Sequence, residues 1–136
     1  MKASYSIDHE RRTIFSQWSG PVTNDEAVAA VKELMSDPAF SPFYDRVVDA
    51  RDVTEVKLTK ANLMNLAVID PIYPSERRAV VSSSAAVFGM SRMFGLLTGK
   101  EEQGTFRAFS DYQQALDWIN EPRPSKKPHS AMKIAR

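Results

Sequence analysis

One segment constrains the fold of this chain more than any other, because it joins a short apolar run to a long one through a serine turn. Residues 79–81 read Ala-Val-Val, serines follow at 82–84, and residues 85–98 are mostly apolar. An apolar run that short, rich in β-branched side chains, is typical of a strand covered on both faces. A strand that leads through a turn into a helix is the repeating unit of α/β domains. We therefore expect residues 79–81 to form a strand near the middle of a sheet.

The segment after the serines has the spacing of a helix that packs on a sheet. Its apolar stripe consists of Ala86, Met90, Met93, Phe94 and Leu97. Val87, Phe88 and Leu96 lie off this stripe, so the helix is apolar around more of its surface than a solvent-facing helix. Burial against neighbouring helices, a dimer interface or an apolar ligand groove would each explain this. Gly89 and Gly95 each cost about 1 kcal/mol relative to alanine, which predicts that another backbone or a ligand comes close there.

The remaining chain reads as strands alternating with helices. Strands are predicted at residues 4–8, 14–18, 46–50 and 105–109, and helices at 24–36, 60–70 and 111–119. Gly20-Pro21 is expected to break the second strand, and residues 51–58 to form a connection. Thr23 with Glu26, and Ser110 with Gln113, have the spacing of capping boxes. The order predicts a single α/β domain with a five-stranded mixed sheet, in which the first strand is antiparallel and the later strands are parallel, and four main helices.

Length and composition indicate how many domains to expect and exclude some classes of function. One domain is expected over residues 1–121, followed by a basic, proline-containing C-terminal tail over residues 122–136. Five of the 18 basic residues lie in that tail, leaving 13 against 17 acidic residues in a mildly acidic body that predicts no nucleic-acid binding. No cysteine is present, so disulfides and thiol chemistry are excluded. The absence of a signal-like or membrane-spanning apolar run predicts a cytoplasmic location and no transmembrane segment.

Groups that could carry catalysis are few. His9 is expected on a turn and His129 in the tail, so neither is placed beside a buried serine. Asp49, Arg51 and Asp52 belong to the loop expected at the end of the third strand, where ligands of α/β sheets usually bind. This cluster offers too few ligands for a metal ion. The sequence therefore predicts no catalytic residue, no metal and no cofactor.

An anion could bind where the central strand meets its helix. Ser82, Ser83 and Ser84 are expected at the strand's carboxyl end and the helix N-terminus, where free backbone amides and the helix dipole favour negative charge. Serine is also an ordinary helix cap, and no glycine-rich phosphate loop surrounds these residues, so the sequence favours capping over an anion site. Arg92 is the only full charge between residues 79 and 97, and it either pairs with an acid or anion or extends to water.

Three segments resemble the bacterial SpoIIAA-like, or STAS-like, proteins. They are residues 49–53, 88–94 and 109–119, and the most specific is the run Phe-Gly-Met-Ser-Arg-Met at 88–93. The resemblance covers about residues 3–121. It implies a small α/β domain related in fold to anti-sigma-factor antagonists and to CRAL/TRIO-type lipid-transfer domains. Most members of this family have no assigned function.

The resemblance also implies a regulatory residue. Anti-sigma-factor antagonists carry a phosphorylatable serine at the start of the helix after the third strand, in an Asp-Ser-Ser context. Laying Asp49 and Val53 on that pattern brings Lys57, Leu58 and Thr59 to the site. Leu58 has no hydroxyl group, so Thr59 is the residue that would take a phosphate. A threonine at a helix start is also an ordinary N-cap, and both interpretations stay open.

Three functional hypotheses follow. The first is a non-enzymatic regulatory or protein-interaction module with an unidentified protein partner or a second copy of the chain, using the helix over residues 85–98. The second is a carrier or sensor of a small apolar or lipid-like ligand on Phe88, Met90, Met93 and Phe94, because methionine-rich surfaces adapt to varied ligands. The third is an enzyme or binder of an anionic small molecule at Arg92 and the serine turn.

Overall fold

The computed structural model describes residues 1–123, and most of the predicted tail lies outside the described residues. Strands and helices alternate after an opening pair of strands. The elements are β1 (Lys2–Asp8), β2 (Thr13–Thr23), α1 (Asn24–Ser36), β3 (Asp45–Lys57), α2 (Lys60–Ile69), β4 (Arg78–Ser82), α3 (Ala85–Leu97), β5 (Phe106–Phe109) and α4 (Tyr112–Ile119).

The five strands form one mixed sheet in the order β1-β2-β3-β4-β5. β1 is antiparallel to β2, and every later pair is parallel, as predicted. β4 is buried along most of its length, which confirms a strand covered on both faces. Its predicted place near the middle is only partly right, because β3 is the central strand and β4 lies next to the short edge strand β5.

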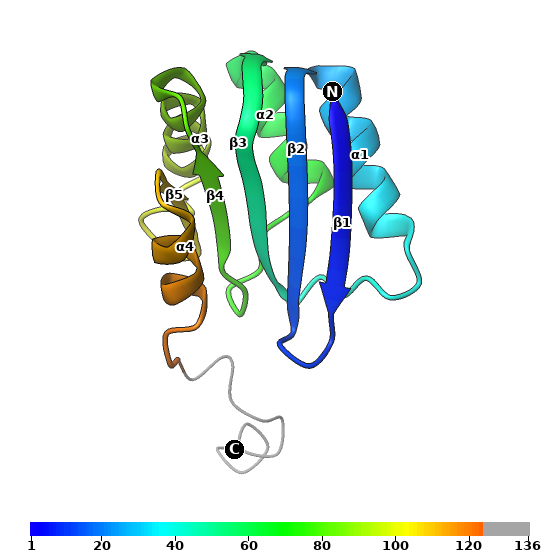
Figure 1. The fold of residues 1–136 in the computed structure, drawn as a ribbon, viewed down its shortest axis with the longest axis vertical. Helices are drawn as coiled ribbons and strands as arrows, with labels where there is room; N and C mark the ends of the chain where they lie inside the picture. The colour runs from blue at the N-terminus through cyan, green and yellow to red at the C-terminus, as the bar shows by residue number, and fades with distance from the viewer. Residues whose placement is uncertain (124–136) are drawn as a thin grey trace.

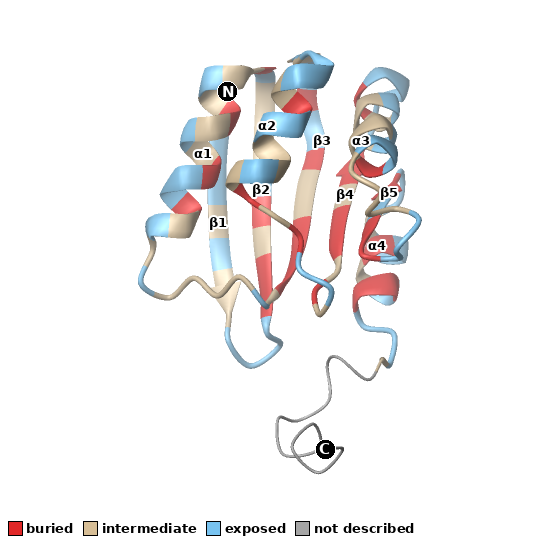
Figure 2. Cartoon of the chain, turned by 180° about the vertical axis from the view of Figure 1, so that it is seen from behind, coloured by how far each residue is buried: buried red, intermediate tan, exposed pale blue. Residues whose placement is uncertain are grey.

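Helices cover the two faces of the sheet unequally (Figures 1 and 2). α1, α2 and α3 lie on one face, and α4 packs alone on the other, over β3, β4 and β5. Side chains alternate along each strand, so β3 and β4 contribute to both sides. Val47 and Val81 belong to the core under α4, whereas Val48 and Val80 lie on the side of the three helices.

Two predicted strand boundaries were wrong. β2 continues through Gly20 and Pro21, and its register against β3 shifts between Gln17 and Ser19 and again between Gly20 and Pro21. The second shift accommodates Pro21, whose backbone nitrogen has no hydrogen to donate to a neighbouring strand. Residues 51–57, predicted as a connection, belong to β3 because they pair with the extended part of β2.

Side-chain caps begin the helices, and two predicted capping boxes need correction. Thr23 accepts from the backbone amide of Glu26 at 3.4 Å, but the Glu26 carboxylate accepts from the Thr23 hydroxyl and from the Met1 ammonium, each at 3.0 Å. The reciprocal bond to the Thr23 amide is therefore replaced by an ion pair. α4 is capped by Asp111 and not by Ser110, since the Asp111 carboxylate accepts from the Gln114 amide at 2.9 Å.

The buried side of α3 is rotated from the predicted stripe. Val87 and Gly95 are buried, Met90 and Phe94 are partly buried between them, and Leu97 is 40% exposed. The sheet and α2 cover this side of α3. The outward side of the helix remains in solvent, so its broad apolar character is not explained by burial within the chain.

The two glycines of α3 have opposite surroundings. A Cβ atom at Gly95 would lie 2.7 Å from a ring carbon of Phe106, whereas a Cβ atom at Gly89 would meet nothing within 4 Å. The predicted close approach is therefore found at Gly95, where the neighbour is a side chain, and is wrong at Gly89.

We expect Gly95→Ala to lower the free energy of unfolding by about 1–2 kcal/mol, because overpacking outweighs the gain in helix propensity. Gly89→Ala is the matched variant and should raise the free energy of unfolding by about 1 kcal/mol. Urea unfolding followed by circular dichroism measures both changes. Shifts of the same sign in the two variants would contradict this account of Gly95.

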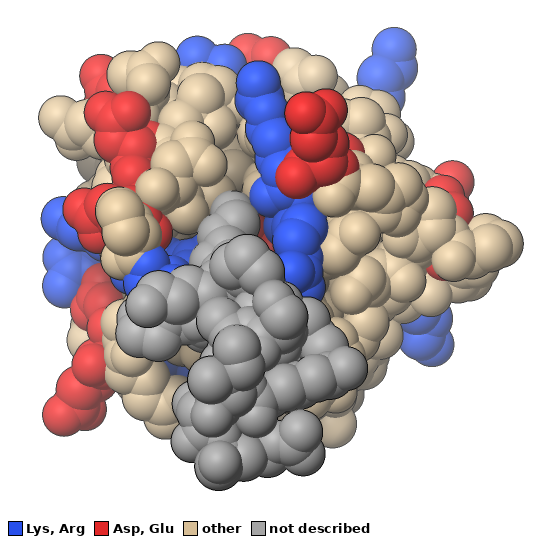
Figure 3. All heavy atoms as spheres, turned by 90° about the horizontal axis from the view of Figure 1, so that it is seen from below, with Lys and Arg blue, Asp and Glu red and all other residues tan. Residues whose placement is uncertain are grey.

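Charged side chains of both signs lie side by side at the end of the molecule that carries the β1–β2 turn (Figure 3). Pairs such as Arg11 with Asp8, at 3.6 Å, and Arg77 with Glu121, at 3.5 Å, contribute to this mixture. Within residues 1–123, none of the helices has both the length and the apolar character needed to cross a bilayer.

Candidate functional site

An apolar cavity of about 150 Å³ lies between the sheet and the three helices that cover one of its faces. All but four of its lining residues are apolar. The apolar ones are Trp18, Val22, Val31, Val48, Ala50, Val53, Val56, Leu58, Leu63, Leu66, Val80, Val87, Met90, Phe94 and Phe106. The other four are Arg46, Asp70, Arg78 and Ser91.

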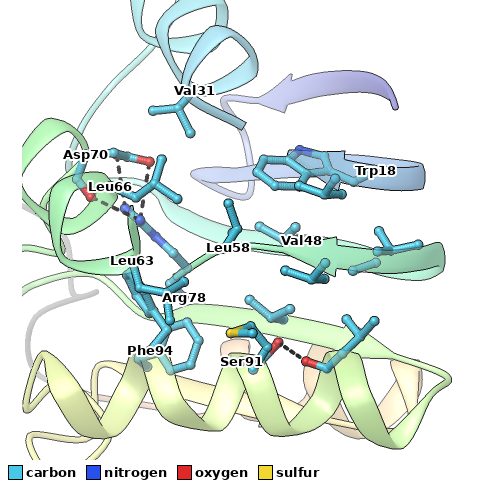
Figure 4. Close-up of a pocket in the computed structure, with 18 of the residues that line it drawn as sticks. Trp18, Val31, Val48, Leu58, Leu63, Leu66, Asp70, Arg78, Ser91 and Phe94 are labelled. Atoms are coloured by element: carbon cyan, nitrogen blue, oxygen red, sulfur yellow. Dashed lines mark hydrogen bonds and ion pairs between the residues drawn. The ribbon is translucent and has the colours of Figure 1, made fainter. Parts of the chain in front are cut away.

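The walls of the cavity come from elements far apart in the sequence (Figure 4). Trp18 of β2 and Val31 of α1 approach from one side, and Phe94 of α3 from the other. Leu63 and Leu66 of α2 lie near Arg78, whose guanidinium reaches Asp70. Ser91 is not a free polar group, because its hydroxyl donates to the backbone carbonyl of Val87 at 2.9 Å within α3.

Two arginines and one aspartate make the polar end of the cavity. Arg46 donates through both terminal nitrogens to the Asp70 carboxylate, with Nη2 to Oδ1 at 3.1 Å. Arg78 donates to the same carboxylate at 3.3 Å from each terminal nitrogen, and to the Asp70 backbone carbonyl at 3.2 Å. All three side chains are at least nine-tenths buried.

Parallel pairing and a helix end bring this cluster together. Arg46 is the second residue of β3, and Arg78 is the first residue of β4. The two residues are direct partners in the parallel register. Asp70 is the C-cap of α2, where backbone carbonyls lack helical partners and the helix dipole is negative. The arginines therefore neutralise a carboxylate and a helix C-terminus together.

Glu76 adds a second acid to the cluster. Its Oε1 accepts from the backbone amide of Tyr73 at 3.1 Å and lies 3.5 Å from Arg78 Nη2. Its Oε2 is buried without a hydrogen-bond partner. Burial raises the pKa of the Glu76 carboxyl, although Arg78 and Arg46 oppose the shift. Burial also lowers the pKa of the Arg78 guanidinium, and the nearby Arg46 charge adds to that shift.

A raised pKa means that the folded protein holds the Glu76 proton more tightly than the unfolded chain does. The carboxyl therefore stabilises the fold below its ordinary pKa of 4.5, and this contribution is lost as the pH rises through the raised value. Glutamine cannot ionise, so Glu76→Gln should gain stability relative to the wild type as the pH rises above 4.5 and through the raised pKa. Urea unfolding at several pH values measures the difference, and the exposed Glu55→Gln is the control. A difference that stays flat across this range would contradict the assignment.

The structure places the residues that were predicted to bind an apolar ligand in three different environments. Met90 and Phe94 line the cavity. Phe88 instead lines a second hollow on the β5 side, together with Arg92 and Glu101. Met93 is partly buried and lines neither space.

The residues predicted for an anion are not brought into one site. Ser82 is buried with an unpartnered hydroxyl, Ser83 is exposed, and Ser84 caps α3 by accepting from the Val87 amide at 3.2 Å. Arg92 lies eight residues after Ser84, about 12 Å along the helix, and pairs with Glu101 at 2.8 Å.

The third-strand residues and Thr59 lie outside the cavity. Asp49 accepts a bidentate pair from Arg51, at 2.9 and 2.8 Å, and this holds the pKa of the Asp49 carboxyl below its usual value. Both belong to β3 and not to a loop, and Asp52 beside them is exposed. Thr59 is the N-cap of α2, and it forms a complete capping box with Asn62. No group of acidic or histidine side chains within residues 1–123 is arranged to hold a metal ion.

Sequence reasoning missed Arg46, Asp70, Arg78 and Glu76. The available signal was a basic residue directly before each apolar run of two successive strands. That pattern becomes informative only when the register pairs Arg46 with Arg78.

Comparison with solved structures shows what the fold is similar to. An anti-sigma factor antagonist from Mycobacterium paratuberculosis superimposes with a TM-score of 0.56 at 18% identity, over 88% of this chain and 96% of that one. An uncharacterized protein of the DUF3478 family with a SpoIIAA-like fold, from Shewanella loihica PV-4, superimposes with a TM-score of 0.59 at 18% identity, over 86% and 93% of the two chains. The chain has a SpoIIAA-like, STAS-like fold. The sequence matches no protein-family model and no curated protein.

Proposed function

We propose that this SpoIIAA-like protein is a non-enzymatic regulatory or protein-interaction module. The observation that carries the proposal is a set of large apolar side chains exposed on α2 and α3, here called the α2–α3 surface. Figure 2 shows exposed residues on the outward sides of both helices. Its large exposed side chains are Met64, Val68, Leu96 and Leu97, with exposed fractions of 42%, 78%, 60% and 40%.

The α2–α3 surface suits a protein partner because it is almost free of charge. α2 carries only Lys60, at its first position, and α3 carries only Arg92. Large apolar side chains exposed on neighbouring helices are a feature of interaction sites. The similar fold named as an anti-sigma factor antagonist acts, by its printed name, on another protein. These points favour a partner with an apolar contact surface of its own.

Thr59 is proposed as the regulatory position. It is exposed and caps the helix that carries Met64 and Val68. A phosphate there would lie at a helix N-terminus, with Lys57 and Lys60 close in the sequence, and both features favour added negative charge. The modification would change the charge at the edge of the α2–α3 surface without rebuilding the core.

The test is affinity capture from the source cells with the full chain as bait. A triple variant, Met64→Ser, Val68→Ser and Leu96→Ser, should lose a specific partner that the wild type retains. Phe43→Ser is the matched control, because Phe43 is also exposed but lies in the loop before β3. Equal capture by both variants, or capture of nothing by the wild type, would contradict the proposal. Light scattering after size exclusion would show a dimer if the occupant is instead a second copy.

The cavity favours a second candidate function, a carrier or sensor of a small apolar ligand. Its volume of about 150 Å³ and its apolar walls match cavities that hold a benzene-sized molecule. Toluene should raise the melting temperature of the wild type but not that of Val48→Phe, in which the added ring fills the cavity. An equal response in the two proteins would count against a ligand in this space.

A further inference from the structure

α2 is held to the domain by fewer buried side chains than α1 and α4. Within the described chain, Leu63 is the only buried residue of the ten in α2, whereas α1 and α4 each have three. Among the residues that the structure describes, the side-chain hydrogen bonds of 60–69 stay within the Thr59–Asn62 capping box. A segment with few buried side chains and few bonds to its neighbours opens locally at a small cost in free energy.

α2 also forms the outer wall of the apolar cavity. Figure 2 shows it between α1 and α3, on the face of the sheet where the cavity lies. Leu63 and Leu66 line the cavity from α2, and Leu58 lines it from the short link before the helix. α3 packs closely on β3, β4 and β5, whereas α2 packs closely on α3. The cavity of about 150 Å³ therefore lies between α2 and the sheet, and side chains that line a cavity lack packing contacts on that side.

The two ends of α2 are anchored unequally. At the C-terminal end, the buried Asp70 carboxylate accepts from Arg46 of β3 and from Arg78 of β4. At the N-terminal end, Thr59 is exposed, and its partner in the capping box belongs to α2 itself. Breaking a buried ion cluster costs more than breaking an exposed cap, so α2 opens more easily from its Thr59 end.

We infer that α2 is a lid over the apolar cavity, which opens from its Thr59 end by local unfolding while the ion cluster at Asp70 stays in place. The inference rests on the second candidate function for its ligand, an apolar molecule that enters and leaves under α2. Isolated helices of ten residues are marginal in water, so α2 loses its helical hydrogen bonds when it leaves the domain. Opening therefore exposes its backbone amides to solvent, and a molecule bound below keeps the lid closed.

Amide hydrogen exchange of the full chain, resolved by residue with nuclear magnetic resonance, measures the opening. In the wild type, the amides of residues 64–69 in α2 should be protected at least about tenfold less than those of residues 116–119 in α4. Equal protection of the two helices would mean that α2 opens only when the whole domain unfolds, and would overturn the inference.

Two cap variants test whether α2 opens on its own. Thr59→Ala removes the cap of α2 and should speed exchange at residues 64–69 by about fivefold. Asp111→Ala removes the cap of α4, where Asp111 accepts from the Gln114 amide, and should speed exchange at residues 116–119 by about the same factor. Exchange at residues 64–69 should then change by less than about twofold, because α4 stays folded while α2 is open. Faster exchange of α2 in Asp111→Ala, or unchanged exchange of α2 in Thr59→Ala, would overturn the inference.

Toluene tests whether the lid belongs to the cavity. At about ten times its dissociation constant, toluene should slow exchange at residues 64–69 of the wild type by about tenfold and leave Val48→Phe unchanged. A higher melting temperature without slower exchange of α2 would mean that the ligand is held without the lid, which overturns the inference and leaves the carrier function standing. Independent opening of α2, together with no effect of toluene on melting, would reject the carrier function alone.

Discussion

Asp70→Ala is expected to lower the free energy of unfolding by about 3–5 kcal/mol, the range found when one member of a buried ion cluster is removed. Asp70 is the only acid in direct contact with both buried arginines, among the residues that the structure describes. Its loss leaves two guanidiniums in an apolar setting with Glu76 as their remaining neighbour acid. Chemical unfolding followed by circular dichroism gives the change, and the exposed Asp52→Ala should shift stability by less than about 0.5 kcal/mol.

A compensated variant separates lost charge balance from lost packing. Replacing the cluster together, as Arg46→Met, Asp70→Leu and Arg78→Met, removes all three charges with side chains of comparable length. Buried ion clusters replaced in this way often leave stability unchanged or higher. The triple variant should therefore be clearly more stable than Asp70→Ala. If the two are equally destabilised, the penalty arises from shape and not from uncompensated charge.

Trp118→Ala should cost about 3–5 kcal/mol, because it empties the centre of the core under α4. The Trp118 ring is packed 5.7 Å from the Phe109 ring, between centroids, and 5.3 Å below the Arg77 guanidinium. Val47, Val81 and Ile119 complete this core. A loss of this size is a large fraction of the stability of a typical domain.

Guanidinium unfolding measured by far-ultraviolet circular dichroism is the suitable assay, since removal of Trp118 also removes one of two tryptophan fluorophores. Leu96→Ala is the control and should change stability by less than about 0.5 kcal/mol, as Leu96 is largely exposed. A similar loss in both variants would show that Trp118 does not anchor α4 as described.

Local chemistry made much of the fold predictable. Thr59 marks the start of α2 by its cap, and Pro38 forces α1 to end at Ser36, because the residue before a proline avoids helical geometry. The strand break predicted at Gly20-Pro21 was wrong, because pairing with β3 outweighs the local preference of those residues. Boundaries set by a neighbouring strand cannot be read from one strand alone.

The candidate site was harder to predict than the fold. Met90 and Phe94 were recognised because helical spacing carries that information. Arg46, Asp70 and Arg78 come from three elements, and each looks like an ordinary surface charge in its own segment. Their meeting depends on strand register and on where α2 ends, which are properties of the assembled sheet.

The sheet separates two interiors that differ in how completely they are filled. Trp118 and its neighbours pack under α4, whereas the apolar cavity of about 150 Å³ lies on the three-helix side. Hydrostatic pressure favours states in which such voids collapse or take up water. Compression should therefore perturb nuclear magnetic resonance signals around Leu63 and Met90 at lower pressures than those around Ala115 and Ile119, so that one half of the domain yields while the other stays intact.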